Sequence, residues 1–169
     1  MFTVEELTKE CQNIFKLAGV SLPNLEVKIN GRLKKVLGRC TYNDEGGRLI
    51  PCCIEFSRDL LETTTPHSIM EVVRHECAHA IVTVRTGERH GHDSVFKKVC
   101  TEIGTDNYGT HYDTIERTVD PNTLYKYLIF CKDCGKLVAR YHRAGKVVKE
   151  TSRYFCKNCG GSLRVDQQY

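Results

Sequence analysis

Two histidines and a glutamate stand at a spacing that can activate a water molecule. The run His75-Glu76-Cys77-Ala78-His79 places the two imidazoles four residues apart, so on a helix they lie one above the other and can reach one metal ion. The Glu76 carboxylate lies beside them, where it can take a proton from water that zinc has made acidic. The flanking residues are apolar, so the helix is expected to be buried, and buried histidines and glutamate are costly without a partner. This motif predicts a catalytic zinc site.

A catalytic zinc site needs a third protein ligand and one open position. Three residues beyond the motif are candidates for that ligand. His90 and His92 follow the expected end of the helix, and Glu102 lies 23 residues after His79. Gly91 precedes His92, and a tight turn there could direct the His92 imidazole back toward the ion. The residues by themselves leave the choice open.

Four of the ten cysteines form two Cys-x-x-Cys-Gly units, Cys131/Cys134 and Cys156/Cys159, with 21 residues between the units. Each unit can direct two thiolates at one metal ion, and four thiolates leave no open position, so they predict a structural zinc site. Metal binding would supply much of the folding free energy of so short a segment. A disulfide pair or a redox motif is the alternative. The other six cysteines are expected to be small buried hydrophobic residues, namely Cys11, Cys40, Cys52, Cys53, Cys77 and Cys100.

Charge is distributed unevenly along the chain. Residues 1–122 hold 15 Lys and Arg against 18 Asp and Glu, whereas residues 123–169 hold 10 against 3. The change falls at Asp120-Pro121-Asn122 and predicts two domains, a metal-binding domain over 1–120 and a four-cysteine zinc ribbon over 121–169. Cations mixed with aromatic residues suit phosphate contacts and base stacking on single-stranded or distorted DNA, and a ribbon with a charged surface and core aromatics fits equally well. The candidate nucleic-acid contacts are Lys136, Arg140, Arg143, Lys146, Lys149, Arg153, Tyr141 and Tyr154.

Composition excludes several classes of protein. The chain has 169 residues, of which 40% are hydrophobic and 27% charged, so it is neither disordered throughout nor fibrous. No apolar run approaches the roughly 18 residues that span a bilayer, and the first residues lack the basic and apolar regions of a secretion signal. We therefore expect an intracellular, cytoplasmic monomer with no membrane partner, associated with the nucleoid or, in a eukaryote, nuclear.

The hydrophobic pattern predicts an α+β fold. Helical spacing is expected over 3–18, 66–85 and 93–103, and strands over 25–29, 36–43 and 48–56, with a hairpin turn at 43–47. In the ribbon, short strands are expected within 125–130, 136–142, 146–154 and 162–165.

Two segments carry a family resemblance. HECAHA, followed by GHDSVF, resembles the SprT-like zinc metalloproteases, which include bacterial SprT and the eukaryotic Spartan protease. In that pattern a short loop follows the His-Glu-x-x-His helix, and the third histidine comes after a glycine, with an aromatic residue four positions later. His92 and Phe96 match it, whereas Asp93 stands where Spartan-type sequences often have glycine. The cysteine units extend the resemblance, because SprT-like proteins commonly carry a C-terminal ribbon.

The resemblance implies a fold, a site and an activity. The fold would be a small zincin-like domain with the His-Glu-x-x-His helix packed on a short β-sheet, followed by a zinc ribbon. His75, His79 and His92 would hold the catalytic zinc, with Glu76 as general base, and a second, structural zinc would sit in the ribbon. The activity would be cleavage of DNA-bound or DNA-crosslinked proteins, as in DNA–protein crosslink repair, with DNA as activator.

Two other functions remain as alternatives. One is a non-proteolytic, zinc-containing adaptor that binds nucleic acid, although Glu76 would have no purpose in a purely structural site. The other is an unrelated metal hydrolase such as an aminopeptidase. His111 or Tyr112 could stabilise an oxyanion in an enzyme. His67 and His142 are expected to be surface or hydrogen-bonded histidines.

Overall fold

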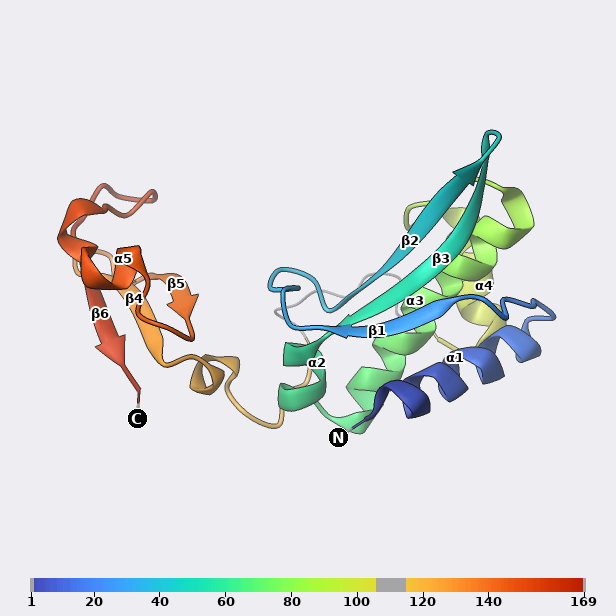
Figure 1. The fold of residues 1–169 in the computed structure, drawn as a ribbon, viewed down its shortest axis with the longest axis horizontal. Coiled ribbons are helices and arrows are strands. Elements are labelled where there is room, and N and C mark those ends of the chain that lie inside the picture. The colour runs from blue at the N-terminus through green and yellow to red at the C-terminus, as the bar shows by residue number, and fades with distance from the viewer. Residues whose placement is uncertain (1, 106–114, 169) are drawn as a thin grey trace. The chain divides into compact units, whose positions relative to one another are not determined.

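The computed structural model describes residues 2–105 and 115–168. Helices alternate along the chain with the strands of two small sheets (Figure 1). The chain divides into two units, Met1–Thr118 and Val119–Tyr169, which we call the N-terminal and the C-terminal unit. Each is described by itself. The mixed α+β character expected from the sequence is confirmed.

The N-terminal unit contains a three-stranded sheet. Its strands are β1 (Glu26–Asn30), β2 (Gly38–Glu45) and β3 (Arg48–Ser57), in the order β1-β3-β2. β1 is parallel to β3, and β2 pairs with β3 antiparallel. The expected hairpin is confirmed, with a tighter loop of Gly46 and Gly47, whose φ angles of 67° and 88° suit a two-residue turn between strands. β2 is an edge strand of this sheet.

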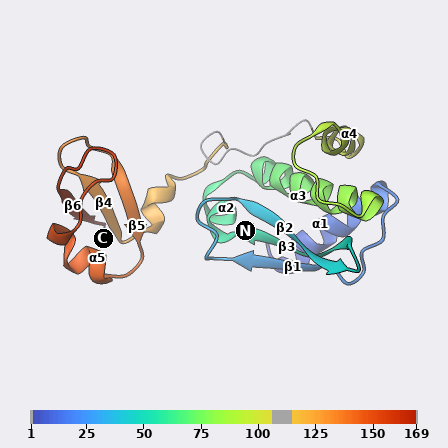
Figure 2. The same cartoon turned by 90° about the horizontal axis from the view of Figure 1, so that it is seen from above.

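Four helices accompany the sheet: α1 (Val4–Leu17), α2 (Arg58–Thr63), α3 (Pro66–Thr86) and α4 (Ser94–Glu102). α1 and α3 lie on one face of the sheet, and α4 packs against α3 (Figure 2). Of these, the sequence pattern missed only α2, a single short helix between β3 and α3. α3 contacts α1, β2, β3 and α4, and is therefore the central element of the unit.

The start and end of α3 follow from local chemistry. The Thr65 side chain accepts a hydrogen bond from the Ser68 backbone N–H, and Pro66 occupies the first turn. Gly87 ends the helix with φ 80°, a left-handed conformation that favours glycine. Between these ends the apolar side of α3 is fully enclosed, with Val72, Cys77 and Ile81 all at 0% exposure. The middle of the helix, where His75 and Glu76 lie, is thus fixed by core packing.

The C-terminal unit has a second antiparallel sheet in the order β5-β4-β6. A short 3-10 helix, η1 (Pro121–Leu124), precedes β4 (Tyr127–Cys131) and β5 (Leu137–Tyr141). α5 (Lys146–Lys149) and the 3-10 turn η2 (Thr151–Arg153) follow, and β6 (Leu163–Gln167) completes the sheet. The expectation of a strand within 146–154 is wrong. The Val148 side chain packs against the small apolar cluster of this unit, and the Val147 side chain lines the neighbouring groove. A helical turn allows both contacts, whereas in a strand the two consecutive side chains would point to opposite faces.

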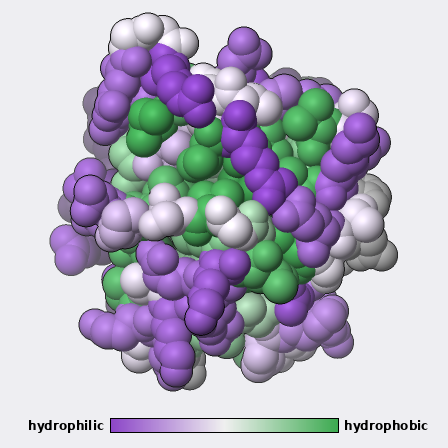
Figure 3. Space-filling model, turned by 90° about the vertical axis from the view of Figure 1, so that its right-hand side faces the viewer, coloured by the Kyte–Doolittle hydropathy of each residue, from purple (hydrophilic) through white to green (hydrophobic). Residues whose placement is uncertain are grey.

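On the face drawn in Figure 3, hydrophilic side chains surround a central hydrophobic area. Among the described residues, no helix has the length and apolar character needed to cross a membrane.

Candidate active site and metal centres

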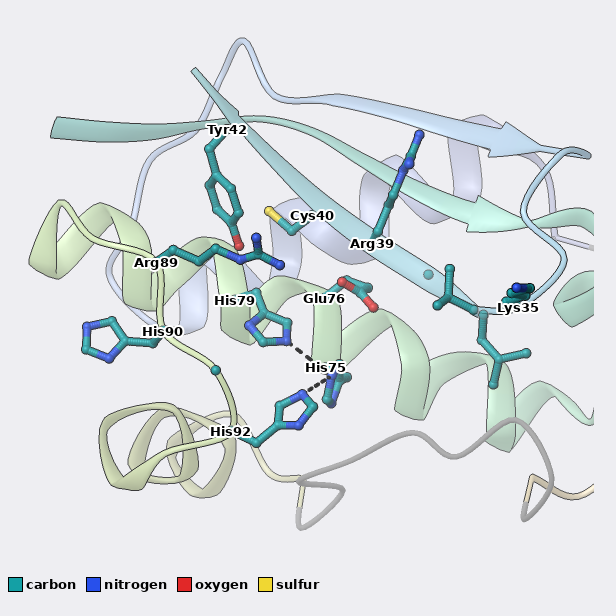
Figure 4. Close-up of a pocket in the computed structure, with 14 residues that line it drawn as sticks. Lys35, Arg39, Cys40, Tyr42, His75, Glu76, His79, Arg89, His90 and His92 are labelled. Carbon is teal, nitrogen blue, oxygen red and sulfur yellow. Dashed lines mark hydrogen bonds between the residues drawn. The ribbon is translucent and has the colours of Figure 1, made fainter. Parts of the chain in front are cut away.

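Three imidazoles from two segments converge in the N-terminal unit (Figure 4). His75 and His79 lie one turn apart on α3, and His92 comes from the loop before α4. The Nε2 atoms of His79 and His92 each lie 3.2 Å from the Nε2 atom of His75. Two ligands of a tetrahedral zinc ion with Zn–N bonds of about 2.0 Å are about 3.3 Å apart. The three side chains therefore fit one zinc ion.

The protonation state of His79 suits metal binding. Burial, together with the charges of His75, His92 and Arg89, lowers the pKa of His79 to about 3. A hydrogen bond from the His79 ring to the backbone carbonyl of His90 acts in the opposite direction. Such a bond fixes the orientation of a ligand histidine and leaves the other ring nitrogen free for a metal. His79 is thus a neutral, oriented imidazole that could hold a metal ion.

The Phe96 ring contacts all three imidazoles. Its ring is fully buried, and its centroid lies 4.3 Å from that of His79 and 5.1 Å from those of His75 and His92. Phe96 is placed by the first turn of α4, where the Asp93 Oδ1 atom accepts hydrogen bonds from the backbone N–H groups of Val95 and Phe96. The Asp93 cap therefore fixes both the start of α4 and the loop that carries His92.

Glu76 lies on the same turn of α3 and faces β2. Its side chain is enclosed, and burial raises its pKa to about 8, while a hydrogen bond from the Cys40 backbone N–H acts to lower it. Gly38, at the start of β2, has no side chain, and this lets the carboxylate lie against the strand. A carboxyl group with a pKa near neutrality can both accept and return a proton.

An open pocket of about 370 Å³ lies beside these residues. Residues of β2 between Gly38 and Tyr42 form its roof, and α3 forms its floor. The loop before α4 and the segment before β2 form its sides. Burial raises the pKa of the Cys40 thiol in the roof to about 12, so this group stays protonated and is a poor metal ligand. The residues that line the pocket include Lys35, Gly38, Arg39, Tyr42, Arg89 and Gly91.

Two alternatives for the third ligand are occupied elsewhere. The His90 Nδ1 atom lies 2.8 Å from the Asp93 Oδ2 atom, and its ring points away from the other imidazoles (Figure 4). Glu102 accepts two hydrogen bonds of 2.7 Å from the Arg85 guanidinium. The structure therefore brings His92, rather than either of these residues, to His75. The oxyanion candidates His111 and Tyr112 lie outside the described residues.

The C-terminal unit holds a second cluster. The Sγ atoms of Cys131 and Cys159 are 3.4 Å apart, those of Cys134 and Cys156 are 3.9 Å apart, and all four lie within 4.8 Å of one another. Sulfur ligands of a tetrahedral zinc ion, with Zn–S bonds of about 2.3 Å, are about 3.8 Å apart. These cysteines are free thiols in the structure. The cluster fits a closed four-thiolate zinc site.

The remaining cysteines and histidines are only partly as expected. Cys11, Cys77 and Cys100 are buried, but the other three are half-buried, so the expectation of burial holds for half of the set. Outside the site, His67 is exposed, and the His142 ring stacks on Tyr125 with centroids 4.5 Å apart.

The candidate nucleic-acid contacts divide into two groups. The cationic ones are exposed, and some have partners: Arg140 donates to the Asn122 side chain and Arg153 pairs with Glu150. Tyr141 and Tyr154 pack against the apolar cluster of the unit. Phe155, another aromatic residue among these cations, is 64% exposed and lines a groove of about 440 Å³. The exposed cations among these candidates are Lys136, Arg140, Arg143, Lys146, Lys149 and Arg153.

Comparison with known proteins identifies the class. Residues 4–118 match the model of the SprT-like family, and this stretch contains α1 to α4, the three converging histidines and Glu76. The chain belongs to the SprT-like family. The resemblance seen in the sequence is confirmed.

Three relatives are similar over much of the chain. "Protein SprT-like" of Streptococcus mutans is 29% identical over 140 residues, which cover 82% of each chain. "Protein SprT-like" of Lactiplantibacillus plantarum is 26% identical over 113 residues, covering 66% of this chain and 69% of the relative. "DNA-dependent metalloprotease dvc-1" of Caenorhabditis elegans is 31% identical over 131 residues, covering 72% of this chain but 35% of the relative.

Proposed function

We propose that this protein is a zinc-dependent endopeptidase that cleaves DNA-bound or DNA-crosslinked proteins and is activated by DNA. The observation that carries the proposal is the convergence of three Nε2 atoms, 3.2 Å apart in two pairs, beside the buried Glu76 carboxylate in an open pocket. A purely structural site would be closed by a fourth side chain. Here the described neighbours leave a pocket large enough for solvent and part of a substrate.

Each residue has a separate role in this reaction. His75, His79 and His92 would hold one zinc ion, which supplies Lewis acidity toward water and a scissile carbonyl when it is bound. Glu76 accepts a proton from the attacking water at its carboxylate and later delivers it to the leaving amine. The hydrogen bond from Cys40 to Glu76 holds this carboxylate beside β2.

The DNA part of the proposal rests on the C-terminal unit and on one relative. The name of the C. elegans relative describes a DNA-dependent metalloprotease. In this chain, the exposed cations of the C-terminal unit suit phosphate contacts. The exposed Phe155 ring beside an apolar groove suits stacking of an unpaired base. The four-thiolate site would hold a second, structural zinc ion.

The test uses Glu76→Gln in the full, zinc-loaded chain. The substrate is a DNA-binding protein presented with single-stranded DNA, with duplex DNA and without DNA. We expect parental cleavage that requires DNA, no cleavage by Glu76→Gln, and unchanged zinc content in both. Glu88→Gln, which alters an exposed carboxylate of the loop after α3, is the matched control and should cut at the parental rate.

Two results would overturn the proposal. Cleavage by Glu76→Gln at the parental rate would show that this carboxylate is not the base. Absence of cleavage by the parent, with DNA binding retained, would favour a non-proteolytic adaptor instead.

A further inference from the structure

The charged side chains around the candidate active site are mostly cationic. Lys35, Arg39 and Arg89 line the pocket, and among the described residues Glu76 is its one carboxylate. Arg39 is already paired with Glu55 of β3. Lys35 and Arg89, in contrast, have no hydrogen bond or ion pair within the described part of the chain. Two uncompensated positive charges therefore border the pocket.

The Arg89 backbone is fixed on both sides. Before it, the Gly87 carbonyl accepts a 2.8 Å hydrogen bond from the Leu49 backbone N–H. After it, the His90 ring lies 2.8 Å from the Asp93 carboxylate. The Arg89 side chain extends from this anchored loop and lines the pocket (Figure 4). Its charge also reaches His79, whose pKa it helps to lower.

The second cation lies across the site from the first. In Figure 4, Arg89 and Lys35 are on opposite sides of Glu76. A polypeptide placed for attack beside Glu76 would therefore extend toward Arg89 on one side of its scissile bond and toward Lys35 on the other. Side chains near that bond would meet positive charge in both directions.

We propose that this cleft selects acidic polypeptide segments, with Arg89 binding a substrate carboxylate next to the scissile bond and Lys35 attracting a second one beyond it. The inference rests on the proposed endopeptidase function and names its substrate class. A guanidinium offers a planar pair of donors that matches a carboxylate. A phosphate could use the same donors, but a nucleic-acid strand in this pocket would take the place of the polypeptide and exclude the attacking water.

The experiment compares three internally quenched peptides that differ in one residue beside the scissile bond, which is Glu, Gln or Lys. The full, zinc-loaded protein is assayed with and without single-stranded DNA. We expect kcat/KM for the Glu peptide to exceed that for the Lys peptide by about tenfold, mainly through KM, as for one charge contact at the surface. The preference should shrink as salt is raised.

Variants assign the preference to named residues. Arg89→Glu should reverse the order of the Glu and Lys peptides, Arg89→Lys should retain part of the preference, and Lys35→Glu should weaken it. Lys9→Glu makes the same change of charge on the exposed side of α1 and should leave all three rates unchanged. A loss of cleavage of the Gln peptide in Arg89→Glu would instead make Arg89 part of the general machinery and overturn its role in specificity.

The outcomes separate this inference from the proposed function. If the parent cuts all three peptides equally and Arg89→Glu does the same, the inference is wrong while the endopeptidase stands. If the parent cuts no peptide under any condition, the endopeptidase itself fails. If single-stranded DNA competes with the peptides in the parent but not in Arg89→Glu, the cleft holds nucleic acid, and the acidic-peptide assignment is overturned.

Discussion

Gly38 and Glu76 are in such close contact that a Cβ atom at position 38 would lie 2.8 Å from the Glu76 Cγ atom and 2.9 Å from its Oε1 atom. The contact joins the first residue of β2 to the middle of α3. It means that the missing side chain of Gly38 sets the position of the Glu76 carboxylate, which we propose as the general base.

Gly38→Ala should therefore impair the proposed peptidase activity without unfolding the protein. The added methyl group forces the carboxylate to move by several tenths of an ångström, and small misplacements of reacting groups can cost about 100-fold in rate. We expect kcat to fall by roughly 10- to 100-fold with little change in KM or zinc content. Gly91→Ala is the control, because a Cβ there meets nothing within 4 Å although Gly91 lines the same pocket. Equal activity of the two variants would contradict this role of Gly38.

A buried ion pair holds the end of the N-terminal unit. Arg117 donates to the Thr63 hydroxyl at 2.6 Å and lies 3.4 Å from the Asp59 carboxylate, which is 3% exposed as a residue. Arg117→Ala removes a positive charge next to a buried negative one, so the free energy of unfolding should fall by about 3 kcal/mol. Denaturant titration measures this change in the free energy of unfolding. Lys28→Ala, in a solvent-exposed pair with Glu26, should cause no measurable loss, and a similar loss in both variants would show that the Arg117 pair is not special.

Removing one thiolate should separate the two metal centres. Cys156→Ser leaves three ligands in the C-terminal cluster, so we expect the protein to lose one of two zinc equivalents and the C-terminal unit to unfold. Amide NMR signals from residues 4–105 should stay in place, because the core of the N-terminal unit does not depend on this cluster. Cys53→Ser, outside both clusters, is the control. Retention of both zinc equivalents in Cys156→Ser would disprove the four-thiolate site.

The contact between α3 and α4 should depend on pH. The Arg85 guanidinium holds the pKa of Glu102 below its ordinary value by hydrogen bonding. The unfolded chain then binds more protons than the folded one between the two pKa values, so this contribution is present above the ordinary pKa of Glu and is lost as pH falls through the folded value. Both side chains are more than a third exposed, so the effect is small.

Arg85→Gln tests this dependence by difference. Thermal unfolding of the parent and the variant should differ at neutral pH and converge in acid. An equal difference at every pH would mean that the Arg85 charge does not act through Glu102.

Local chemistry made much of the fold predictable. Thr65-Pro66 and Gly87 mark the ends of α3, and adjacent glycines mark the turn between β2 and β3. The α+β character followed from the hydrophobic pattern and such signals, whereas the family followed from the His-Glu-x-x-His motif, the GHDSVF segment and the cysteine units. The prediction of a strand within 146–154 was wrong because the alternation of side chains in this segment resembles that of a strand. The apolar surface available in the C-terminal unit is small and favours a helical turn. Short segments of this kind are decided by tertiary packing.

The arrangement of the pocket was less accessible to sequence reasoning. The Gly91 turn favoured His92, but spacing alone did not exclude His90 or Glu102, because only the folded loop shows which side chain turns toward His75. Gly38 gave no chemical signal, since its importance lies in the side chain it lacks. Arg89 belongs to a run of charged loop residues, and nothing in its neighbours distinguishes a cation that enters the pocket from one in solvent.

α3 serves the hydrophobic interior with one side and the pocket with the other, and this has a consequence for how the protein tolerates change. A partly folded chain cannot keep the three imidazoles together, so the candidate site is assembled only when the whole N-terminal unit has folded cooperatively. Substitutions deep in the interior, at Val72 or Ile81 for example, should thus damage metal affinity long before they abolish compactness. An inhibitor of the proposed activity need not bind in the pocket, because a ligand that weakens the packing of α3 against its neighbours would also separate the three imidazoles.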